Sequence, residues 1–475
     1  MIYWQSFSLI NNSFQFFYVN NPPFFQELTA HLGERISVNA DVLEAHGAGY
    51  SYHECMPPDA VVFPNTTEEV SGIVSICAKY GVPIIPFGAG TSIEGHVLAL
   101  RGGICIDLRE MNQVLEVNKD DMYVMVQAGV TRNQLDELLE GTGFFFPIGP
   151  GVNATLGGMA STRASGTNAV RYGTMKDNVL ALTAVLPDGK IIKTGSKAKK
   201  SSAGYDLTRL LVGAEGTLGV ITELTLKLHS EPETIYAAVC AFPTVEAAVA
   251  TAIKTIQKGV PIAKIELLDA AMMRAINRYS SLDYEEVPTL FLEFHGAVAE
   301  VEAQILKVEV YAHSFGAAGF VWEKDEARRK RLWRARTDAA PSAMALRPGA
   351  KLMSTDVCVP ISQLAKCIVD TQLDIEKMGI MAPILGHVGD GNFHLTILIN
   401  PEYKEEFERA KALNERLVRR ALAMGGTCTG EHGIGVGKLQ YMALEHGSSL
   451  DMMRAIKHAI DPQNLMNPGK LLPEI

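Results

Sequence analysis

The chain has 475 residues, of which 47% are hydrophobic and 20% charged, and its formal net charge is −10. This length is too great for one ordinary core, so we expect two or three domains. The negative charge argues against nucleic acid as a general partner, and no apolar run approaches the ~18 residues of a membrane span. The seven cysteines lie far apart without a C-x-x-C pair, which indicates a reducing, intracellular compartment.

Residues 1–40 are expected to form an N-terminal extension. Its first two dozen residues, MIYWQSFSLINNSFQFFYVNNPPF, contain no Lys or Arg, so they resemble neither a secretory signal nor an Arg-rich transit peptide. We interpret this extension as a disordered or mis-started segment.

Residues 41–235 have the pattern of a mixed α/β domain. The runs VPIIPF, GICIDL and MYVMVQAGV read as strands and alternate with helix-like segments. Thr66 with Glu69, and Thr131 with Gln134, each predict a capping box at the start of a helix.

Three glycine-rich segments in this domain favour a large phosphate-bearing cofactor. PFGAGTSIEGH, at residues 86–96, follows an apolar strand and offers backbone N–H groups and two hydroxyls to an anion. The segment 149–179 is long and built of small residues, as a loop around a flat cofactor would be, and 213–226 runs into a strand. One such loop is weak support; three in one domain favour a cofactor site.

The standard nucleotide fingerprints are absent. GPGVNA fits G-x-G-x-x-A formally, but Pro150 lies inside it and the acidic residue expected about twenty positions later is missing until Asp177. HGIGVGK has His432 in place of the first glycine of a P-loop and Leu439 in place of its Ser or Thr. Neither a Rossmann site nor a P-loop is therefore expected.

A second domain is expected over residues 236–425, after the charged and proline-containing HSEPE segment. Strands such as PTLFLEFHG and LTILIN alternate with helices, as in an α+β domain, and residues 403–424 suit an amphipathic helix. We expect residues 426–475 to complete the active site and return to the first domain.

The segment HVGDGNFH places His387 and His394 seven residues apart around a Gly-Asp-Gly centre. In one continuous strand their rings would lie on opposite faces, so a turn at residues 389–391 is needed to bring them together. The histidines then either ligate a metal or lie in a structural turn.

GTCTGEHGIGVGK offers a third ligand and a proton acceptor. Glu431 and His432 are adjacent between glycines. His387, His394 and Glu431 would make an open site for zinc or manganese, and His432 could take a proton near neutral pH. A metal-dependent hydrolase could use the same residues, but it leaves the three glycine-rich segments unexplained.

The basic run at residues 327–336 does not read as a nucleic-acid patch. Arg336 falls on a helical stripe with Leu332, Ala339 and Ala340. An arginine on an apolar face needs an anionic partner, which is either a structural carboxylate or the carboxylate of a substrate.

These motifs resemble the vanillyl-alcohol oxidase family of flavoproteins and, within it, the FAD-linked D-2-hydroxyacid dehydrogenases. The resemblance is greatest to the cytochrome-linked D-lactate dehydrogenases and the glycolate oxidase flavin subunits. It covers residues 40–473. The segments that carry it are PDAVVFPNTTEEV, PFGAGTSIEGH, GPGVNATLGGM, RYGTMKDNV, GAEGTLGVITE, STDVCVP, GHVGDGNFH, GTCTGEHGIGVGK and DPQNLMNPGK.

The resemblance implies an α+β fold: a non-Rossmann (PCMH-type) FAD-binding domain of two α/β subdomains, and a cap domain with a ferredoxin-like antiparallel sheet. Relatives with covalent flavin carry a histidine at the position of Thr91 or Ser92, so His96 is interpreted as structural and FAD as noncovalent. The implied FAD-binding residues are Gly88, Gly90, Thr91, Ser92, Pro150, Gly157, Ser165, Gly166, Tyr172, Gly173, Ile221 and Asn467.

The resemblance also implies oxidation of a (R)-2-hydroxy acid, with D-lactate to pyruvate first and glycolate or D-2-hydroxyglutarate as alternatives. Arg336 would bind the substrate carboxylate and His432 would be the general base, with hydride passing to flavin N5. His387, His394 and Glu431 match the metal ligands. Relatives acting on 2-hydroxyglutarate carry a lysine where Ser354 stands here, which favours a monocarboxylate.

Reduced FAD would pass electrons to cytochrome c, a quinone or an electron-transfer flavoprotein, and the resemblance is compatible with a homodimer. We expect an intracellular protein. It would be cytoplasmic with peripheral attachment at the inner membrane or, in a eukaryote, in the mitochondrial matrix.

Overall fold

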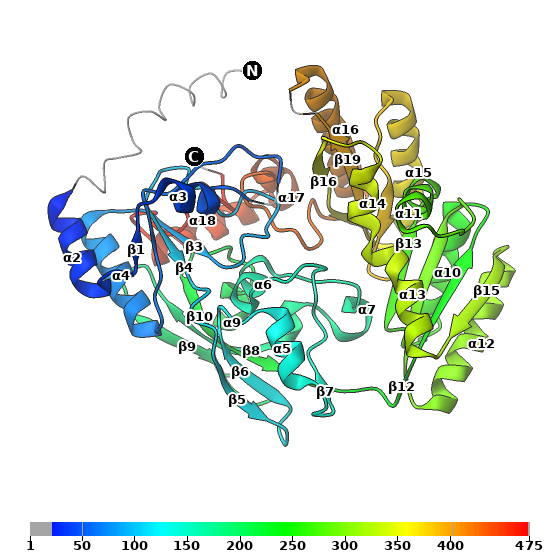
Figure 1. The fold of residues 1–475 in the computed structure, drawn as a ribbon, viewed down its shortest axis with the longest axis horizontal. Helices are drawn as coiled ribbons and strands as arrows, with labels where there is room; N and C mark the ends of the chain where they lie inside the picture. Colours follow the sequence, from blue (N-terminus) through cyan, green and yellow to red (C-terminus); the bar gives the residue numbers. More distant parts are fainter. Residues whose placement is uncertain (1–20, 50, 401, 474–475) are drawn as a thin grey trace.

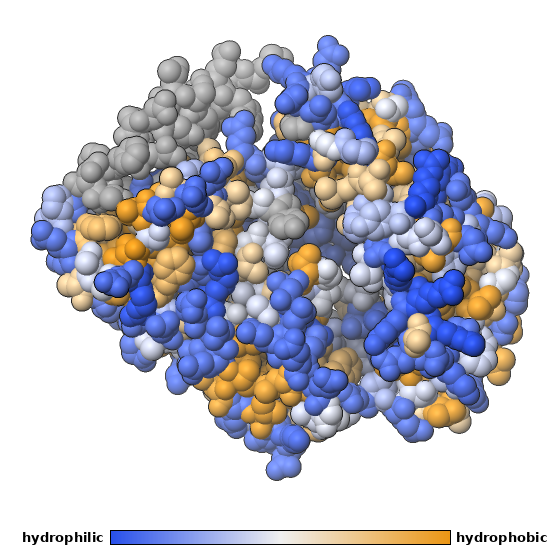
Figure 2. All heavy atoms as spheres, viewed as in Figure 1, coloured by the Kyte–Doolittle hydropathy of each residue, from blue (hydrophilic) through white to orange (hydrophobic). Residues whose placement is uncertain are grey.

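The computed structural model describes residues 21–49, 51–400 and 402–473. It has two lobes joined by the chain that leads into β12, and the C-terminal segment returns to the first lobe (Figure 1). Figure 2 shows that the surface is hollowed between the two lobes. Within the described residues, no helix combines the length and apolar character needed to cross a membrane.

The first lobe contains two main sheets that share one core, and β7 and β11 form a separate two-stranded sheet. In the smaller sheet, of order β1-β2-β4-β3, β4 pairs in parallel with β2 and β3; the larger sheet, β5-β6-β10-β8-β9, is antiparallel throughout. The strands are β1 Ile36–Ser37, β2 Ala60–Val62, β3 Ile84–Phe87, β4 Ile104–Asp107, β5 Val114–Asn118, β6 Tyr123–Gln127, β7 Phe144–Phe145, β8 Val179–Val185, β9 Ile191–Gly195, β10 Val220–Lys227 and β11 His229–Ser230. The helices are α2 Pro22–Leu32, α3 Ala40–Gly47, α4 Thr67–Tyr80, α5 Arg132–Leu139, α6 Leu156–Thr162, α7 Ala169–Tyr172, α8 Met175–Asn178 and α9 Leu207–Leu211.

The expected helix starts are present, with one difference in their chemistry. Thr131 and Gln134 form the predicted capping box of α5. The Thr66 side chain accepts the N–H of Glu69 at the start of α4, but the Glu69 carboxylate binds Arg35 and the N–H of Asn65 instead of returning to Thr66. An ion pair outside the helix has thus replaced the second half of that capping box.

The expectation of a disordered extension over residues 1–40 is wrong for its described part. Helix α2 buries Phe24, Leu28 and Leu32 in the core of the first lobe and packs on α4, because three apolar side chains at helical spacing face one side. The first twenty residues of that extension lie outside the described residues.

The second lobe is built on one antiparallel sheet covered by helices on both faces. Its order is β15-β12-β14-β13-β18-β19-β16, and β17 also pairs with β19. Helices α10, α12, α15 and α16 bury apolar side chains on one face, and α11, α13 and α14 cover the other. The strands are β12 Thr234–Ala241, β13 Lys264–Leu268, β14 Thr289–Gly296, β15 Ala318–Glu323, β16 Lys351–Ser354, β17 Val357–Cys358, β18 Ile384–Gly386 and β19 Asn392–Ile399. The helices are α10 Val245–Gln257, α11 Ala270–Ser280, α12 Val298–Ser314, α13 Glu326–Thr337, α14 Ala339–Ala345, α15 Ile361–Met378 and α16 Lys404–Ala423.

Helix α16 is the predicted amphipathic helix, whereas the predicted stripe around Arg336 is only partly present. The helix breaks at Asp338, between α13 and α14, so Ala340 is exposed although Ala339 is buried. Because of this break, α14 does not continue the helical face of α13 on which Leu332 and Arg336 lie.

The C-terminal segment contacts both lobes. It contains η1 Leu439–Tyr441, α17 Met442–His446 and α18 Ser449–Ile460. Tyr441 and Leu450 belong to the core of the second lobe, whereas Met466 pairs with Ile84 at the start of β3 in the first lobe. The segment thereby fixes the loop that precedes it, residues 426–438, between the lobes.

Candidate active site

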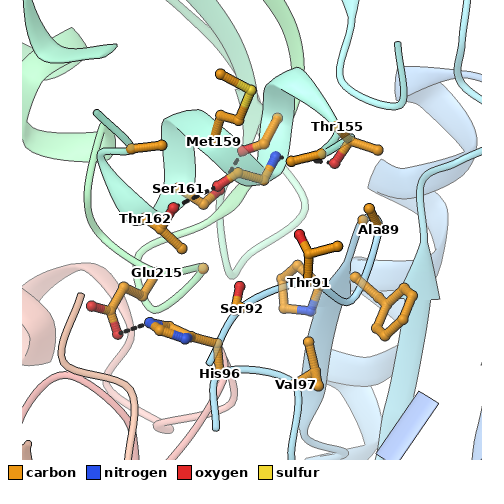
Figure 3. A pocket seen from close by; sticks show the side chains of 18 of the residues that line it. Ala89, Thr91, Ser92, His96, Val97, Thr155, Met159, Ser161, Thr162 and Glu215 are labelled. Carbon is orange, nitrogen blue, oxygen red and sulfur yellow. Dashed lines mark hydrogen bonds and ion pairs between the residues drawn. The ribbon is translucent and has the colours of Figure 1, made fainter. Parts of the chain in front are cut away.

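The glycine-rich loop after β3 forms one wall of a pocket in the first lobe. Within the described chain, no backbone N–H of residues 88–93 donates a hydrogen bond to another backbone group or side chain. In Figure 3, Thr91 and Ser92 of this loop lie across the pocket from Thr155, Ser161 and Thr162 of the α6 region. Free N–H groups and hydroxyls facing one cavity suit a phosphate-bearing ligand.

Nine of the twelve residues predicted to bind FAD line this single pocket. They are Gly88, Gly90, Thr91, Ser92, Pro150, Gly157, Ser165, Ile221 and Asn467. Glu431 and His432 line the same pocket, although they come from the far end of the chain. The predicted cofactor site and the predicted base therefore meet.

Three predicted residues lie outside the lining. Gly166 bridges to Gly149, Gly173 packs against Asp177, and the Tyr172 hydroxyl lies 2.8 Å from Nδ1 of His295 in β14. Tyr172 thus joins the first lobe to the second in this structure.

The predicted turn between the two histidines is present. β18 and β19 form an antiparallel hairpin, and Gly391 has φ +83°, with a Cβ position only 2.1 Å from the Val359 carbonyl oxygen. Only glycine tolerates both conditions. The rings of His387 and His394 lie 5.5 Å apart, and their Nε2 atoms are 3.1 and 3.3 Å from Glu431 Oε1.

Hydrogen bonds from the Nδ1 atoms of His387 and His394 hold the two rings in their orientation. Nδ1 of His394 donates to the Thr355 carbonyl, and Nδ1 of His387 donates to the Glu266 carboxylate. Each Nε2 is therefore left facing Glu431, as ligation of a metal requires. Although burial opposes the charged form, Glu266 and Glu431 raise the pKa of His387 to about 10, so these carboxylates favour a positive charge between them.

His432 stacks on His394 in a second, overlapping cluster. Their ring centroids are 4.8 Å apart, and one nitrogen or oxygen from each of Asp356, His394 and His432 lies within 4.8 Å of the others. Burial lowers the pKa of His432 to about 4, which keeps the imidazole neutral and able to accept a proton. Its Nδ1 is buried without a hydrogen-bond partner in the described chain.

Asp356, just before β17, positions the loop that carries Glu431 and His432. Its Oδ2 accepts the N–H groups of Gly430, Glu431 and His432 at 2.7 to 2.9 Å. Burial opposes its ionisation, but the positive charge of Lys438 and the N–H group of Glu431 hold the pKa of Asp356 well below its usual range. A permanent anion thus satisfies three consecutive donors of an irregular segment.

Glu215 positions the next part of the loop from the first lobe. Its carboxylate accepts the N–H groups of Ile434 and Gly435 at 2.7 and 2.8 Å. Nε2 of His96 lies 3.2 Å from it, in keeping with the structural role expected for His96. One short loop is therefore held by a carboxylate from each lobe.

Arg336 has a structural partner. Its Nε donates to Glu266 Oε2 at 2.7 Å, and within the described chain its two terminal nitrogens make no hydrogen bond. A substrate carboxylate could still bind those nitrogens, so both interpretations of the sequence are compatible with this geometry.

Sequence reasoning missed Glu266, Asp356 and Glu215. Each is the one acidic residue of a short apolar or glycine-rich segment, IELL, STDVCVP and GAEGTLG, and each is at most 5% exposed. A buried carboxylate is costly without partners, so an unpaired acid in such a segment is the signal that could have found them.

Both implied groups fit the residues present. The donor set of two imidazoles and a carboxylate suits zinc or manganese, and Glu431 Oε2 is buried without a partner in the described chain. The N–H groups of residues 88–93, which have no partner among the described residues, and the small residues opposite them suit the pyrophosphate of FAD.

Comparison with known proteins shows the family of the chain. Residues 58–195 match the FAD binding domain, and residues 231–471 match the family of FAD linked oxidases, C-terminal domain. The chain therefore belongs to the FAD-linked oxidases of the vanillyl-alcohol oxidase (PCMH) type, and it is a flavoprotein oxidoreductase. The alternative of a metal-dependent hydrolase is not supported.

Curated relatives cover most of the chain. A probable mitochondrial D-lactate dehydrogenase of Danio rerio is 52% identical, covering 92% of this chain and 89% of the relative. The mitochondrial D-lactate dehydrogenase [cytochrome] of Arabidopsis thaliana is 45% identical, covering 94% and 79%. Glycolate oxidase subunit GlcD of Bacillus subtilis is 35% identical, covering 87% and 89%.

Solved structures confirm the predicted fold class. A 4-ethylphenol oxidase from Gulosibacter chungangensis superposes with a TM-score of 0.78 at 18% identity, covering 95% of this chain and 97% of that one. A p-cresol methylhydroxylase superposes with a TM-score of 0.77 at 17% identity, covering 94% and 96%. At these identities the likeness shows the fold alone.

Replacing Asp356 by Asn should loosen the loop that it holds. We expect amide hydrogen exchange in residues 429–433 to accelerate by about 10- to 100-fold, because hydrogen bonds to a charged group contribute ~1.5–3 kcal/mol. Asp269→Asn, which removes another buried carboxylate at the start of α11, should leave that segment protected. Unchanged exchange in Asp356→Asn would show that the loop is held by other contacts.

Proposed function

We propose that this protein oxidises D-lactate to pyruvate in the mitochondrion, with FAD bound noncovalently and a cytochrome-type acceptor. The observation that carries the proposal is the meeting of His387, His394, Glu431 and His432 at the pocket of the FAD binding domain. The relatives of Danio rerio and Arabidopsis thaliana, named as mitochondrial D-lactate dehydrogenases, supply the substrate and compartment.

In this proposal the chain binds and orients the substrate. Arg336 binds the carboxylate through its terminal nitrogens, while Glu266 holds its Nε. Neutral His432 accepts the hydroxyl proton. When bound, FAD supplies the acceptor for the hydride from Cα, and a zinc or manganese ion held by His387, His394 and Glu431 supplies Lewis acidity.

Two related substrates are the alternatives. Glycolate is favoured by the relative of Bacillus subtilis, whose name assigns it to glycolate oxidase. D-2-Hydroxyglutarate is disfavoured, because Ser354 at the end of β16 offers no charge for a second carboxylate.

An anaerobic titration of the purified flavoprotein tests the substrate. D-Lactate should bleach the visible flavin absorbance, whereas L-lactate at equal concentration should not, because only one enantiomer presents its Cα hydrogen to FAD while the carboxylate and hydroxyl are held. Glycolate and D-2-hydroxyglutarate serve as comparisons. Faster bleaching by either of them, or equal bleaching by both lactates, would contradict the proposal.

Replacing His432 by Ala tests the base. We expect FAD and metal contents to be retained and flavin reduction by D-lactate in a single turnover to slow by about 10²- to 10⁴-fold. In the control His313→Ala, which changes an exposed side chain of α12, D-lactate should reduce the flavin at the normal rate. A near-normal rate in His432→Ala would refute the assignment, and loss of the metal would make His432 a ligand instead.

A further inference from the structure

Glu266 is a fully buried carboxylate in the middle of β13. Ile265 and Leu267 on either side of it pack into the core under α10 and α12, so Glu266 points to the opposite face, which α13 covers. In Figure 1, β13 and α13 lie together in the second lobe. A carboxylate buried in this way requires partners for both of its oxygens.

The two oxygens of Glu266 bind two different parts of the candidate site. Oε1 accepts from Nδ1 of His387 at 2.6 Å, and Oε2 accepts from Nε of Arg336 at 2.7 Å. Nε2 of His387 in turn faces Glu431 at 3.1 Å. One carboxylate therefore connects the arginine of α13 with a histidine of the candidate metal set.

The register of the sheet explains how one residue reaches both. β13 pairs with β18, with Leu267 opposite Gly386, so His387 leaves the end of β18 beside Glu266. Arg336 lies near the end of α13, which covers the same face. Neither contact needs a flexible loop to adjust.

We propose that Glu266 is a positioning residue that sets His387 for metal binding and Arg336 for substrate binding at the same time. This inference rests on the proposed function for the role of Arg336, but not for the role of His387. The Nδ1–H of His387 on a carboxylate fixes which nitrogen faces the metal and makes that nitrogen a stronger ligand.

Glutamine cannot replace glutamate in this position. A glutamate accepts from both partners, whereas a glutamine has one acceptor oxygen and one NH2 group, which would face an N–H of His387 or of Arg336. The substitution also removes the negative charge that faces two cationic or metal-binding groups. A role limited to packing would instead tolerate this nearly isosteric change.

The test measures metal affinity and kinetics separately in Glu266→Gln. Holoenzyme that retains FAD is stripped with EDTA and titrated with Zn²⁺ or Mn²⁺ without substrate. We expect metal affinity to fall by about 10- to 100-fold with FAD content unchanged. At saturating metal, KM for D-lactate should rise by more than kcat falls. Glu266→Asp, which keeps the charge, should recover part of the metal affinity.

Asp374→Asn is the matched control. Asp374 is a buried carboxylate of the same lobe that binds Arg416 and Arg420, away from the histidines. The Asp374→Asn variant should bind metal with the affinity of the wild type. Wild-type metal affinity in Glu266→Gln, or an equal loss in Asp374→Asn, would overturn the inference. If the Glu266→Gln variant does not fold, the same measurements are made on Glu266→Asp. Unchanged metal affinity and an unchanged KM in Glu266→Asp would then overturn the inference about Glu266. Absence of turnover in the wild type would refute the D-lactate proposal and leave the metal titration valid.

Discussion

The candidate site depends on two buried carboxylates that hold one irregular loop between the lobes. Residues 430–435 contain three glycines and cannot satisfy their own backbone donors. Asp356 from the second lobe accepts three of these N–H groups, and Glu215 from the first lobe accepts two more. Glu431 and His432 therefore occupy defined positions although they lie in a loop.

The charges around this loop favour a cation. Glu266 and Asp356 are buried carboxylates and Glu431 is a partly buried one, and the permanent cations beside them are Arg336 and Lys438. The carboxylates outnumber the permanent cations, so the two histidines lie in a negative environment that stabilises a proton or a metal ion. The glycine-rich loop at residues 88–93 lines the same pocket as Glu431, and its backbone N–H groups, which have no partner within the described chain, favour an anion. Groups that favour a cation and groups that favour an anion therefore lie on neighbouring parts of one site.

Local patterns predicted much of the fold and the histidine pair. Caps at Thr66 and Thr131, the amphipathic helix α16 and the turn at Gly391 follow from short-range chemistry, and all are present. The partners of the site do not follow in this way. Glu266 lies 121 residues from His387, and Glu215 lies 220 from Gly435, so only the sheet register and the docking of the lobes bring them together. Helix α2 was missed because aromatic and asparagine-rich flanks obscured its apolar spacing.

The most direct test of this account is anomalous diffraction from crystals of the holoenzyme, collected at the absorption edges of manganese and zinc. We predict one anomalous peak, coordinated by Nε2 of His387, Nε2 of His394 and the carboxylate of Glu431. A peak coordinated by Asp356, His394 and His432, the overlapping cluster, would contradict it, because His432 would then be a ligand and not the proton acceptor.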